Sequence, residues 1–322
     1  MRYKNSEKVY KSHLKEVIPM IIHMLRNKSK ESKPKYKSDI PVNYLKKEDL
    51  LNLEDNSVIR LGHSTLLFKI ENEFILTDPV FSKRASPFSF IGPKRFHDNP
   101  IEIEDLPQIK SVIISHNHYD HLDKKSVKLL KDKVGTFYTT LGVGKHLIKF
   151  GVSKHKIVEL NWWENKKIDN IDFICTPAQH FSGRTLFDRD KTLWSSWVIK
   201  SSKLTLFFGA DSGYFNGYKE IASRYAPFDM TFLEVGAYNE KWRDIHMMPH
   251  ESIQAHKDLN GKVMFPIHNG TFDLSLHAWY EPFEMVSRLA KEHTIDVRFP
   301  KMGDVISLLT TTNTYKWWQI KN

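Results

Sequence analysis

Histidine and aspartate side chains follow the ends of several apolar, strand-like runs in this chain of 322 residues. The densest group is His116-Asn-His-Tyr-Asp-His121, directly after the run Ser111-Val-Ile-Ile-Ser115. Three further runs lead to His180, Asp211 and His268. Imidazole nitrogen and carboxylate oxygen are ligands that zinc accepts in proteins. Because strand ends can meet at one edge of a sheet, these side chains predict a site for two metal ions.

The spacing within the histidine segment divides the ligands between the two ions. His116 and His118 lie two positions apart in an extended segment, so both imidazoles point to the same side. Asp120 and His121 come after the chain turns, and they can face a second ion. The expected sets are His116, His118 and His180 for one ion and Asp120, His121 and His268 for the other, with Asp211 bridging both.

A pair of ions in these positions predicts hydrolysis. Two metals roughly 3.5–4 Å apart can hold a bridging hydroxide at neutral pH and clamp the oxygens of a displacement reaction. The ligand set contains no thiolate, which favours zinc and leaves manganese and iron as alternatives. We therefore expect two Zn2+ ions, with Asp120 and Asp211 taking part in catalysis.

The elements that must position these residues are strands and helices in two groups. Residues 57–70 and 73–77 form apolar runs around Glu71-Asn72 and predict a hairpin, and residues 81–107 predict a long loop. Helices are expected at 123–133, 143–150, 249–260 and 282–292. Further strands are expected at 111–115, 157–160, 168–175, 193–199, 204–208, 230–235, 262–267, 296–299 and 305–309. Two groups of strands, each followed by helices, predict an α/β fold with two sheets between helical layers.

The net charge of +10 is concentrated in an N-terminal arm. Residues 1–37 hold eleven of the 48 basic side chains and three of the 38 acidic ones, so the rest of the chain is nearly neutral. Apolar residues recur at helical spacing between positions 10 and 25, which predicts an amphipathic helix. A solvated arm and contact with an anionic membrane surface both fit this pattern. We expect residues 1–56 to be a basic arm and linker, and residues 57–322 to be the metallohydrolase domain.

Composition narrows the location and the partners. No secretory signal and no apolar segment of membrane-spanning length is apparent. The single cysteine, Cys175, has no partner for an internal disulfide, which favours a reducing compartment. The body shows no basic stripe interleaved with aromatic residues, so nucleic acid is not an expected partner. The expectation is a cytoplasmic protein, peripheral at the inner face of the membrane if the arm binds lipid.

The histidine segment is the signature of the metallo-β-lactamase superfamily, and further motifs narrow the resemblance. They are Leu61-Gly-His-Ser-Thr65, Leu76-Thr-Asp-Pro79, Ala85 to Lys94, Thr176-Pro-Ala-Gln-His180, Gly183-Arg-Thr-Leu-Phe-Asp188, Gly209-Ala-Asp-Ser-Gly-Tyr214, Ile245-His246 and Ile267-His-Asn-Gly-Thr-Phe272. Over residues 57–285 the chain resembles the branch that contains N-acyl-phosphatidylethanolamine-hydrolysing phospholipase D. The resemblance implies an αββα sandwich of two mixed sheets, two zinc ions in the positions above, and a phosphodiester in a phospholipid as substrate. Paired subunits, a homodimer, would be natural for a family that acts at a bilayer.

Several residues outside the ligand sets have expected roles near the substrate. His246 is not needed for either ion, and we expect it to contact the substrate phosphoryl or to assist the leaving group. Arg184 is expected to pair with phosphate or to form a structural salt bridge. Asn269, where the family often has tryptophan, is expected at the substrate rim. Asp78 is expected to orient a ligand histidine, and His63 to approach the site from the first hairpin.

Two other functions fit parts of the sequence. One is a cytosolic metallohydrolase of a small lactone or a phosphorylated metabolite, which would act without detergent or lipid. The other is a membrane-associated binding protein with an inactive site, which would lack bound metal. Five tryptophans (162, 163, 194, 197 and 242) belong either to the core or to an apolar groove for an acyl chain.

Overall fold

The computed structural model describes residues 2–7, 26–185, 187–310 and 316–319. Within these residues, the strands form two mixed sheets of seven strands each. The first sheet contains, in spatial order, β14 (Val305–Ser307), β1 (Ser57–Arg60), β2 (Leu66–Ile70), β3 (Glu73–Thr77), β4 (Ile109–Ile114), β5 (Val134–Thr140) and β6 (Ile157–Leu160). The second contains β13 (Asp296–Val297), β12 (Gly261–Ile267), β11 (Phe228–Glu234), β10 (Thr205–Phe208), β9 (Ser196–Lys200), β8 (Ile171–Thr176) and β7 (Asn165–Ile168).

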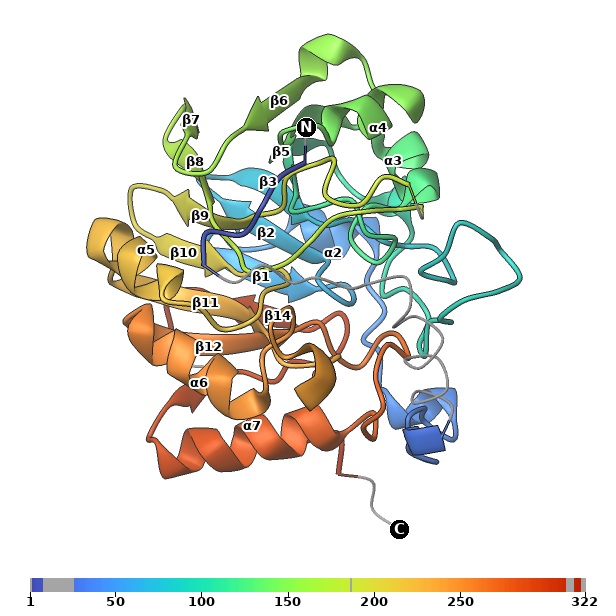
Figure 1. Ribbon diagram of the computed structural model, residues 1–322. Coiled ribbons are helices and arrows are strands. Elements are labelled where there is room, and N and C mark those ends of the chain that lie inside the picture. Colours follow the sequence, from blue (N-terminus) through green and yellow to red (C-terminus); the bar gives the residue numbers. More distant parts are fainter. Residues whose placement is uncertain (1, 8–25, 186, 311–315, 320–322) are drawn as a thin grey trace.

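Helices cover the outer face of each sheet (Figure 1). The first sheet carries α3 (Lys124–Leu130) and α4 (Gly144–Lys149), with the short α2 (Lys47–Leu51) nearby. The second sheet carries α5 (Gly217–Tyr225), α6 (Pro249–Asp258) and α7 (Glu281–Glu292). Short 3-10 helices lie at Lys37–Asp39, Ile103–Asp105, Lys154–Lys156 and Glu240–Trp242. The αββα arrangement predicted from the sequence is confirmed.

Three apolar cores separate the four layers. Along β1, Val58 packs between the two sheets, whereas the next residue, Ile59, packs in the core of the α3–α4 layer. On β10, Phe208 packs between the sheets and Phe207 packs in the core of the α5–α7 layer. Neighbouring residues of a strand point to opposite faces, so one strand supplies two cores. This explains why consecutive residues of strands such as β1 and β10 are apolar instead of alternating with polar residues.

The strand directions bring the ends of several strands to one edge of the sandwich. β3, β4 and β5 run parallel in the first sheet, and β10, β11 and β12 run parallel in the second. β8 and β10 both pair antiparallel with β9, so these two strands end on the same side. Ligands bind at the carboxyl ends of strands in open α/β sheets. The loops that follow β4, β8, β10, β11 and β12 are therefore the place to look for a site.

Three predictions of individual elements were wrong. The run 57–70 is not one strand: residues 61–65 form a loop between β1 and β2, although the hairpin turn at Glu71-Asn72 is present and both its residues have positive φ. The run 168–175 is two strands joined at Asp169-Asn170. The helix predicted at 123–133 ends at Leu130, and β5, a strand that was not predicted, begins at Val134. Its neighbours in β5 are β-branched and aromatic residues, and pairing with β4 and β6 buries them.

The described parts of the N-terminal arm lie against the domain. The amphipathic helix predicted between residues 10 and 25 lies outside the described residues. After residue 25 the arm contacts the domain at Glu31, whose backbone carbonyl accepts a hydrogen bond from the backbone N–H of Trp279 at 2.9 Å. Ile40 and Leu50, which are 1% and 0% exposed, belong to the apolar cores. Part of the segment expected to be arm and linker therefore packs into the domain. In the described part of the chain, no helix combines the length and apolarity needed to cross a bilayer.

Candidate metal centre

The segment His116–His121 leaves the end of β4 as a compact loop. The backbone N–H groups of His121 and Leu122 both donate to the carbonyl of His118, at 3.2 and 2.8 Å. This turn directs the second half of the segment away from the extended first half. Asp123 then caps α3 by accepting hydrogen bonds from two backbone N–H groups of its first turn. The loop is therefore fixed at both ends, by a buried strand and by a capped helix.

Four side chains form the first candidate subsite. Nε2 of His116 lies 2.9 Å from Nδ1 of His118, and Nε2 of His180 lies 3.3 Å from that same Nδ1. Oδ2 of Asp211 lies 3.6 Å from Nε2 of His180 and 3.8 Å from Nε2 of His116. The four side chains offer ligand atoms that all lie within 4.8 Å of one another. One cation could contact all of them.

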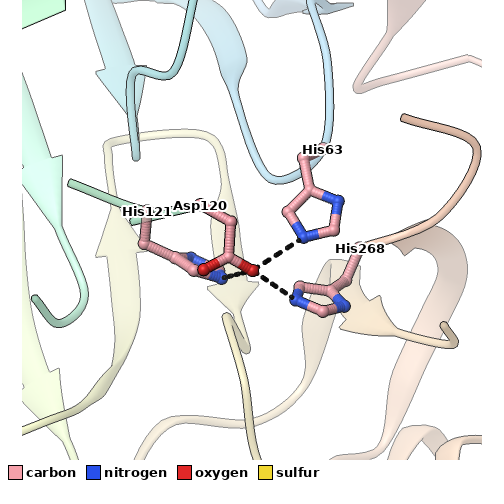
Figure 2. Close-up of side chains that lie close together, drawn as sticks. All are labelled: His63, Asp120, His121 and His268. Carbon is pink, nitrogen blue, oxygen red and sulfur yellow. Dashed lines mark ion pairs between the residues drawn. The ribbon is translucent and has the colours of Figure 1, made fainter. Parts of the chain in front are cut away.

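The second candidate subsite adjoins the first. Figure 2 shows Asp120 with its Oδ2 directed at two imidazoles, 3.4 Å from Nε2 of His268 and 3.7 Å from Nε2 of His121. Oδ1 of Asp211 lies 3.0 Å from Nε2 of His121 and 3.2 Å from Nε2 of His268. The two oxygens of Asp211 thus face different subsites. The seven side chains singled out in the sequence are brought together in the two sets in which they were expected.

The pKa shifts of these groups mark a centre that attracts positive charge: His116 and His180 are neutral, whereas His268 holds a proton that a metal ion would displace. Burial lowers the pKa of His116 and of His180 well below the usual value, so both imidazoles keep the neutral form whose lone pair binds metal. Burial acts to raise the pKa of Asp211, but His121 and His268 outweigh it and hold that pKa well below its usual value. Burial acts to lower the pKa of His268, yet the carboxylates beside it raise this pKa to about 10. The centre of the cluster attracts positive charge.

Buried atoms without hydrogen bonds mark the same place. Among the described residues, Nε2 of His121, Nε2 of His268 and Oδ1 of Asp211 are buried without a hydrogen bond of acceptable geometry. An unpaired buried polar atom costs roughly 1–3 kcal/mol, and a cation in contact with all three atoms would remove that cost. Imidazole and carboxylate without thiolate fit zinc, and they also fit manganese or iron. The residues present are therefore compatible with bound metal ions.

Asp78 supports the second subsite by a hydrogen bond to His121, the kind of contact expected from the sequence. Its Oδ2 accepts a hydrogen bond from Nδ1 of His121 at 2.7 Å, and the same oxygen accepts from the hydroxyl of Ser115 at 2.6 Å. The backbone N–H of Ser115 donates to Oδ1 at 2.7 Å. A carboxylate in this position fixes the ring orientation of a metal-ligating histidine and leaves Nε2 as the ligand atom.

Asn5 supports the first subsite, although no pattern in the sequence singled it out. Its Nδ2 donates to the carbonyl of His180 at 2.9 Å, and its Oδ1 accepts from the backbone N–H of His180 at 3.1 Å. The indole Nε1 of Trp194 donates to the same Oδ1 at 2.9 Å. On the side-chain end, Nδ1 of His180 donates to the carbonyl of Ile245 at 2.9 Å. Residues from the far N-terminus therefore help to hold a candidate ligand.

Glu234 at the end of β11 was also missed, and it holds His246. Its Oε2 accepts from Nδ1 of His246 at 2.6 Å, while its Oε1 accepts from the backbone N–H groups of Ser212 and Met247 at 3.0 and 3.1 Å. Glu234 is 0% exposed, and burial raises its pKa while His246 opposes that shift. The His246 ring lies 5.1 Å from the ring of His180. Nδ1 of His246 is thereby occupied, and Nε2 is the nitrogen left for chemistry.

Two residues expected at the substrate have other contacts in the structure. The guanidinium of Arg184 donates to the carbonyls of Asn117 and Leu122, each at 2.7 Å, and so braces the histidine loop. These contacts form no salt bridge. Asn269 is 4% exposed, and its carbonyl accepts from the buried Arg60 at 2.8 Å. Contact of either side chain with a substrate stays a prediction.

A pocket of about 330 Å³ opens beside both subsites. Its polar lining is His118, Asp120, Asp211, His246 and His268, and its apolar lining is Phe181, Ala237, Trp242, Ile245 and Leu274. Of the five tryptophans considered for an acyl groove, Trp242 lines this pocket, whereas Trp194 and Trp197 are buried. The lining of the pocket therefore combines charged groups with apolar side chains.

Comparison with known proteins points to one superfamily. Residues 73–269 match the model of the β-lactamase superfamily domain. The chain is 32% identical over 303 residues to N-acyl-phosphatidylethanolamine-hydrolyzing phospholipase D 1 of Caenorhabditis elegans, covering 88% of this chain and 85% of that one. It is 40% identical over 263 residues to an uncharacterized protein of Mycobacterium tuberculosis, covering 80% of this chain and 70% of that one.

Solved structures show the same fold at lower sequence identity. The metallo hydrolase Igni18 of Ignicoccus hospitalis aligns with a TM-score of 0.59 and 21% sequence identity. The alignment covers 78% of this chain and 97% of that protein. At this identity the likeness establishes the architecture of the sandwich and not the reaction.

Proposed function

The chain belongs to the β-lactamase superfamily, within which it is related to N-acyl-phosphatidylethanolamine-hydrolysing phospholipases D, and from this we propose that it is a zinc-dependent phosphodiesterase of phospholipase D type. Its substrates would be N-acyl-phosphatidylethanolamine or similar lipids. The observation that carries the proposal is the bridging position of Asp211, whose two oxygens face two adjoining His/Asp groups. Metal-dependent hydrolysis is the activity named for several relatives, and the lipid substrate is the specific part of the proposal.

Each of the two candidate subsites would hold one zinc ion. His116, His118 and His180 would hold one, and Asp120, His121 and His268 the other, with Asp211 contacting both. When bound, such a pair supplies an activated water and polarises the phosphoryl oxygens. Asp78 and Asn5 keep the ligand histidines in place, and Arg184 holds the loop that carries most of the ligands.

His246 would act on the leaving group. Hydrolysis adds water to phosphorus and breaks the bond between phosphorus and the ethanolamine oxygen, which yields phosphatidic acid and an N-acylethanolamine. The departing oxygen needs a proton. Because Glu234 fixes Nδ1 of His246 as a donor, Nε2 can carry or accept the proton on the pocket side. His246 lines the pocket together with Asp120 and Asp211, so it lies near the place where that bond would break.

The apolar residues of the pocket would receive the acyl chain. Phe181, Trp242 and Leu274 line the same pocket as polar groups of both subsites. Burying a methylene group contributes about 0.8 kcal/mol, so even a short stretch of acyl chain would add affinity. Arg184 and Asn269 would contact the substrate only if substrate binding replaced their present hydrogen bonds within the protein.

A small lactone or a phosphorylated metabolite is the second candidate substrate class. A pocket of about 330 Å³ is at the lower end of the range for small-molecule sites, which fits such a compound. The two classes differ in their dependence on an interface: a lipid phosphodiesterase would be stimulated by vesicles, whereas a hydrolase of small metabolites would not.

Location and assembly stay part of the proposal. A cytoplasmic enzyme with a basic N-terminal arm would reach phospholipid through peripheral contact at the inner face of the membrane, as a homodimer and without nucleic acid as a partner. Binding of the full chain to anionic and to neutral vesicles would test the membrane contact.

The substrate is tested with purified, zinc-loaded protein and mixed vesicles that contain N-acyl-phosphatidylethanolamine. Mass spectrometry should find phosphatidic acid and N-acylethanolamine in equal amounts. His246→Ala should lower the rate by about 10²–10⁴-fold, the range for loss of a positioned acid or base. Absence of both products, with zinc bound and with related diesters also uncleaved, would reject the lipid phosphodiesterase.

A further inference from the structure

His63 adds a third imidazole to the second subsite. It lies in the loop 61–65 between β1 and β2, and Figure 2 shows it across Asp120 from His121. Its Nε2 lies 3.3 Å from Oδ2 of Asp120, the same oxygen that faces Nε2 of His268 at 3.4 Å. The four residues offer ligand atoms that lie within 4.8 Å of one another. Three imidazole nitrogens thus surround one carboxylate oxygen.

The spacing of these atoms is that of ligands around one ion. With metal–ligand distances of about 2.0–2.2 Å, two ligands of a tetrahedral ion lie roughly 3.3–3.6 Å apart. The distance from Nε2 of His63 to Oδ2 of Asp120 falls in this range, as does the corresponding distance from His268. His63 therefore lies at nearly the same distance from Asp120 as His268, which is itself a proposed ligand.

The ring of His63 also differs from those of ordinary buried histidines in this protein. It is 2% exposed, and within the described residues neither ring nitrogen has a hydrogen bond of acceptable geometry. His97, equally buried, has partners for both nitrogens, the carbonyl of Asp98 at 2.8 Å and the hydroxyl of Thr271 at 3.1 Å. Buried polar groups are nearly always satisfied, so an unsatisfied imidazole aimed into a cluster of ligands calls for a partner.

The backbone holds His63 in this position. Its carbonyl accepts from the backbone N–H of His268 at 2.9 Å, and the two imidazole rings lie 3.8 Å apart between centroids. Further along the loop, the hydroxyl of Thr65 donates to the carbonyl of Asp78 at 2.7 Å. Asp78 in turn holds His121. The loop is therefore hydrogen-bonded to His268 itself and to Asp78, which holds His121.

We propose that His63 is itself a ligand, through Nε2, of the cation in the second subsite. This rests on the proposed function only in requiring a cation at that place and does not depend on the substrate. Each subsite then has three imidazoles and a share of Asp211, and the second has Asp120 in addition. A site so rich in imidazole favours zinc over manganese or magnesium. The competing role is a hydrogen bond from His63 to Asp120 without contact to the ion.

Two substitutions separate these roles. His63→Gln keeps a side-chain N–H that can donate to Asp120 but removes the imidazole, whereas His63→Ala removes both. His277→Gln is the matched control, because His277 is half-buried, donates from Nδ1 to the carbonyl of Ala278 at 2.8 Å and belongs to neither subsite. Each protein is stripped of metal, reloaded with cobalt(II), and studied by absorption and by proton NMR. Zinc affinity is measured in parallel by competition with a chromophoric chelator.

Ligation predicts that His63→Gln and His63→Ala behave alike. Both should lose one set of hyperfine-shifted imidazole signals and bind the second zinc ion roughly 100-fold or more weakly, since loss of even an outer partner of a ligand costs 10–100-fold. His277→Gln should match the wild type. An unchanged set of shifted signals in His63→Gln would overturn the proposal. These measurements involve no lipid, so they remain valid even if the proposed lipid substrate is wrong. If His63 proves not to be a ligand, the cleavage of lipid is still tested by its own assay.

Discussion

Oε2 of Glu234 lies 2.6 Å from Nδ1 of His246, which joins the end of β11 to the loop that lines the pocket. Glu234 is fully buried, and its other oxygen is held by two backbone N–H groups, so it cannot turn away from the histidine. The pair has the geometry in which a carboxylate selects the tautomer of a catalytic imidazole.

Substitution of Glu234 tests this role. In Glu234→Gln the retained oxygen still accepts from the two backbone groups, but the new amide donates toward Nδ1 and favours the opposite tautomer of His246. We expect kcat to fall by about 10²-fold or more with little change in KM, because the effect is on a proton and not on binding. Steady-state kinetics on vesicles measure the split. Equal loss in Glu240→Gln, at an exposed residue, or a change confined to KM, would argue against it.

Asn5 is expected to position His180. Asn5→Ala removes hydrogen bonds to both backbone groups of His180 and one from Trp194. Zinc affinity at the first subsite should fall by about tenfold, the lower end of the range for outer partners of metal ligands. Chelator competition measures this, with the exposed Lys4→Ala as the control. If Asn5→Ala and Lys4→Ala bind zinc equally well, the N-terminal contact is incidental.

Asp78 is expected to matter for the second subsite. In Asp78→Asn, the amide can satisfy only some of the three hydrogen bonds that now reach the carboxylate from Ser115 and His121. The second zinc ion should bind roughly 10–100-fold more weakly, while the first is nearly unaffected. The exposed Asp132→Asn provides the comparison. Equal weakening of both ions would mean that Asp78 supports the whole loop and not one ligand.

His256 should make the protein less stable in mild acid. Its Nδ1 shares a hydrogen bond of 2.7 Å with the hydroxyl of Thr231, and burial lowers its pKa to about 4. The unfolded chain binds a proton below about pH 6.5 while the folded chain does not, so the stability tied to this residue falls as pH drops from about 6.5 toward 4. Between pH 7 and pH 5 the loss is about 2 kcal/mol. Urea unfolding of His256→Gln should lack this loss, and a parallel pH dependence of the two proteins would contradict it.

The clustering of the candidate ligands could be predicted from the sequence because each of them lies in a segment that follows an apolar strand. His268 directly follows a run that could only be buried, and His180 and Asp211 come within a few residues of the ends of such runs. His116 and His118 share a side of an extended segment. Parallel strands then leave one edge at which their ends can meet. Layer order followed from the same pattern, since strands and helices appear in two groups.

Partners of the ligands could not be predicted in the same way. Asn5 lies 175 positions before His180, and no local pattern predicts a contact over that separation. Glu234 left a weak signal, a carboxylate at the end of an otherwise apolar strand, which implies a buried partner. The guanidinium of Arg184 binds backbone carbonyls of the histidine loop, and the position of backbone carbonyls cannot be read from residue types.

Anomalous diffraction at the zinc edge, from crystals of the zinc-loaded protein, tests the central claim most directly. Two peaks are predicted, one enclosed by His116, His118 and His180 and the other beside Asp120, His121 and His268, with Asp211 in contact with both. A single peak, or none, with the imidazoles of either group directed apart, would contradict the dinuclear centre and with it the proposed reaction.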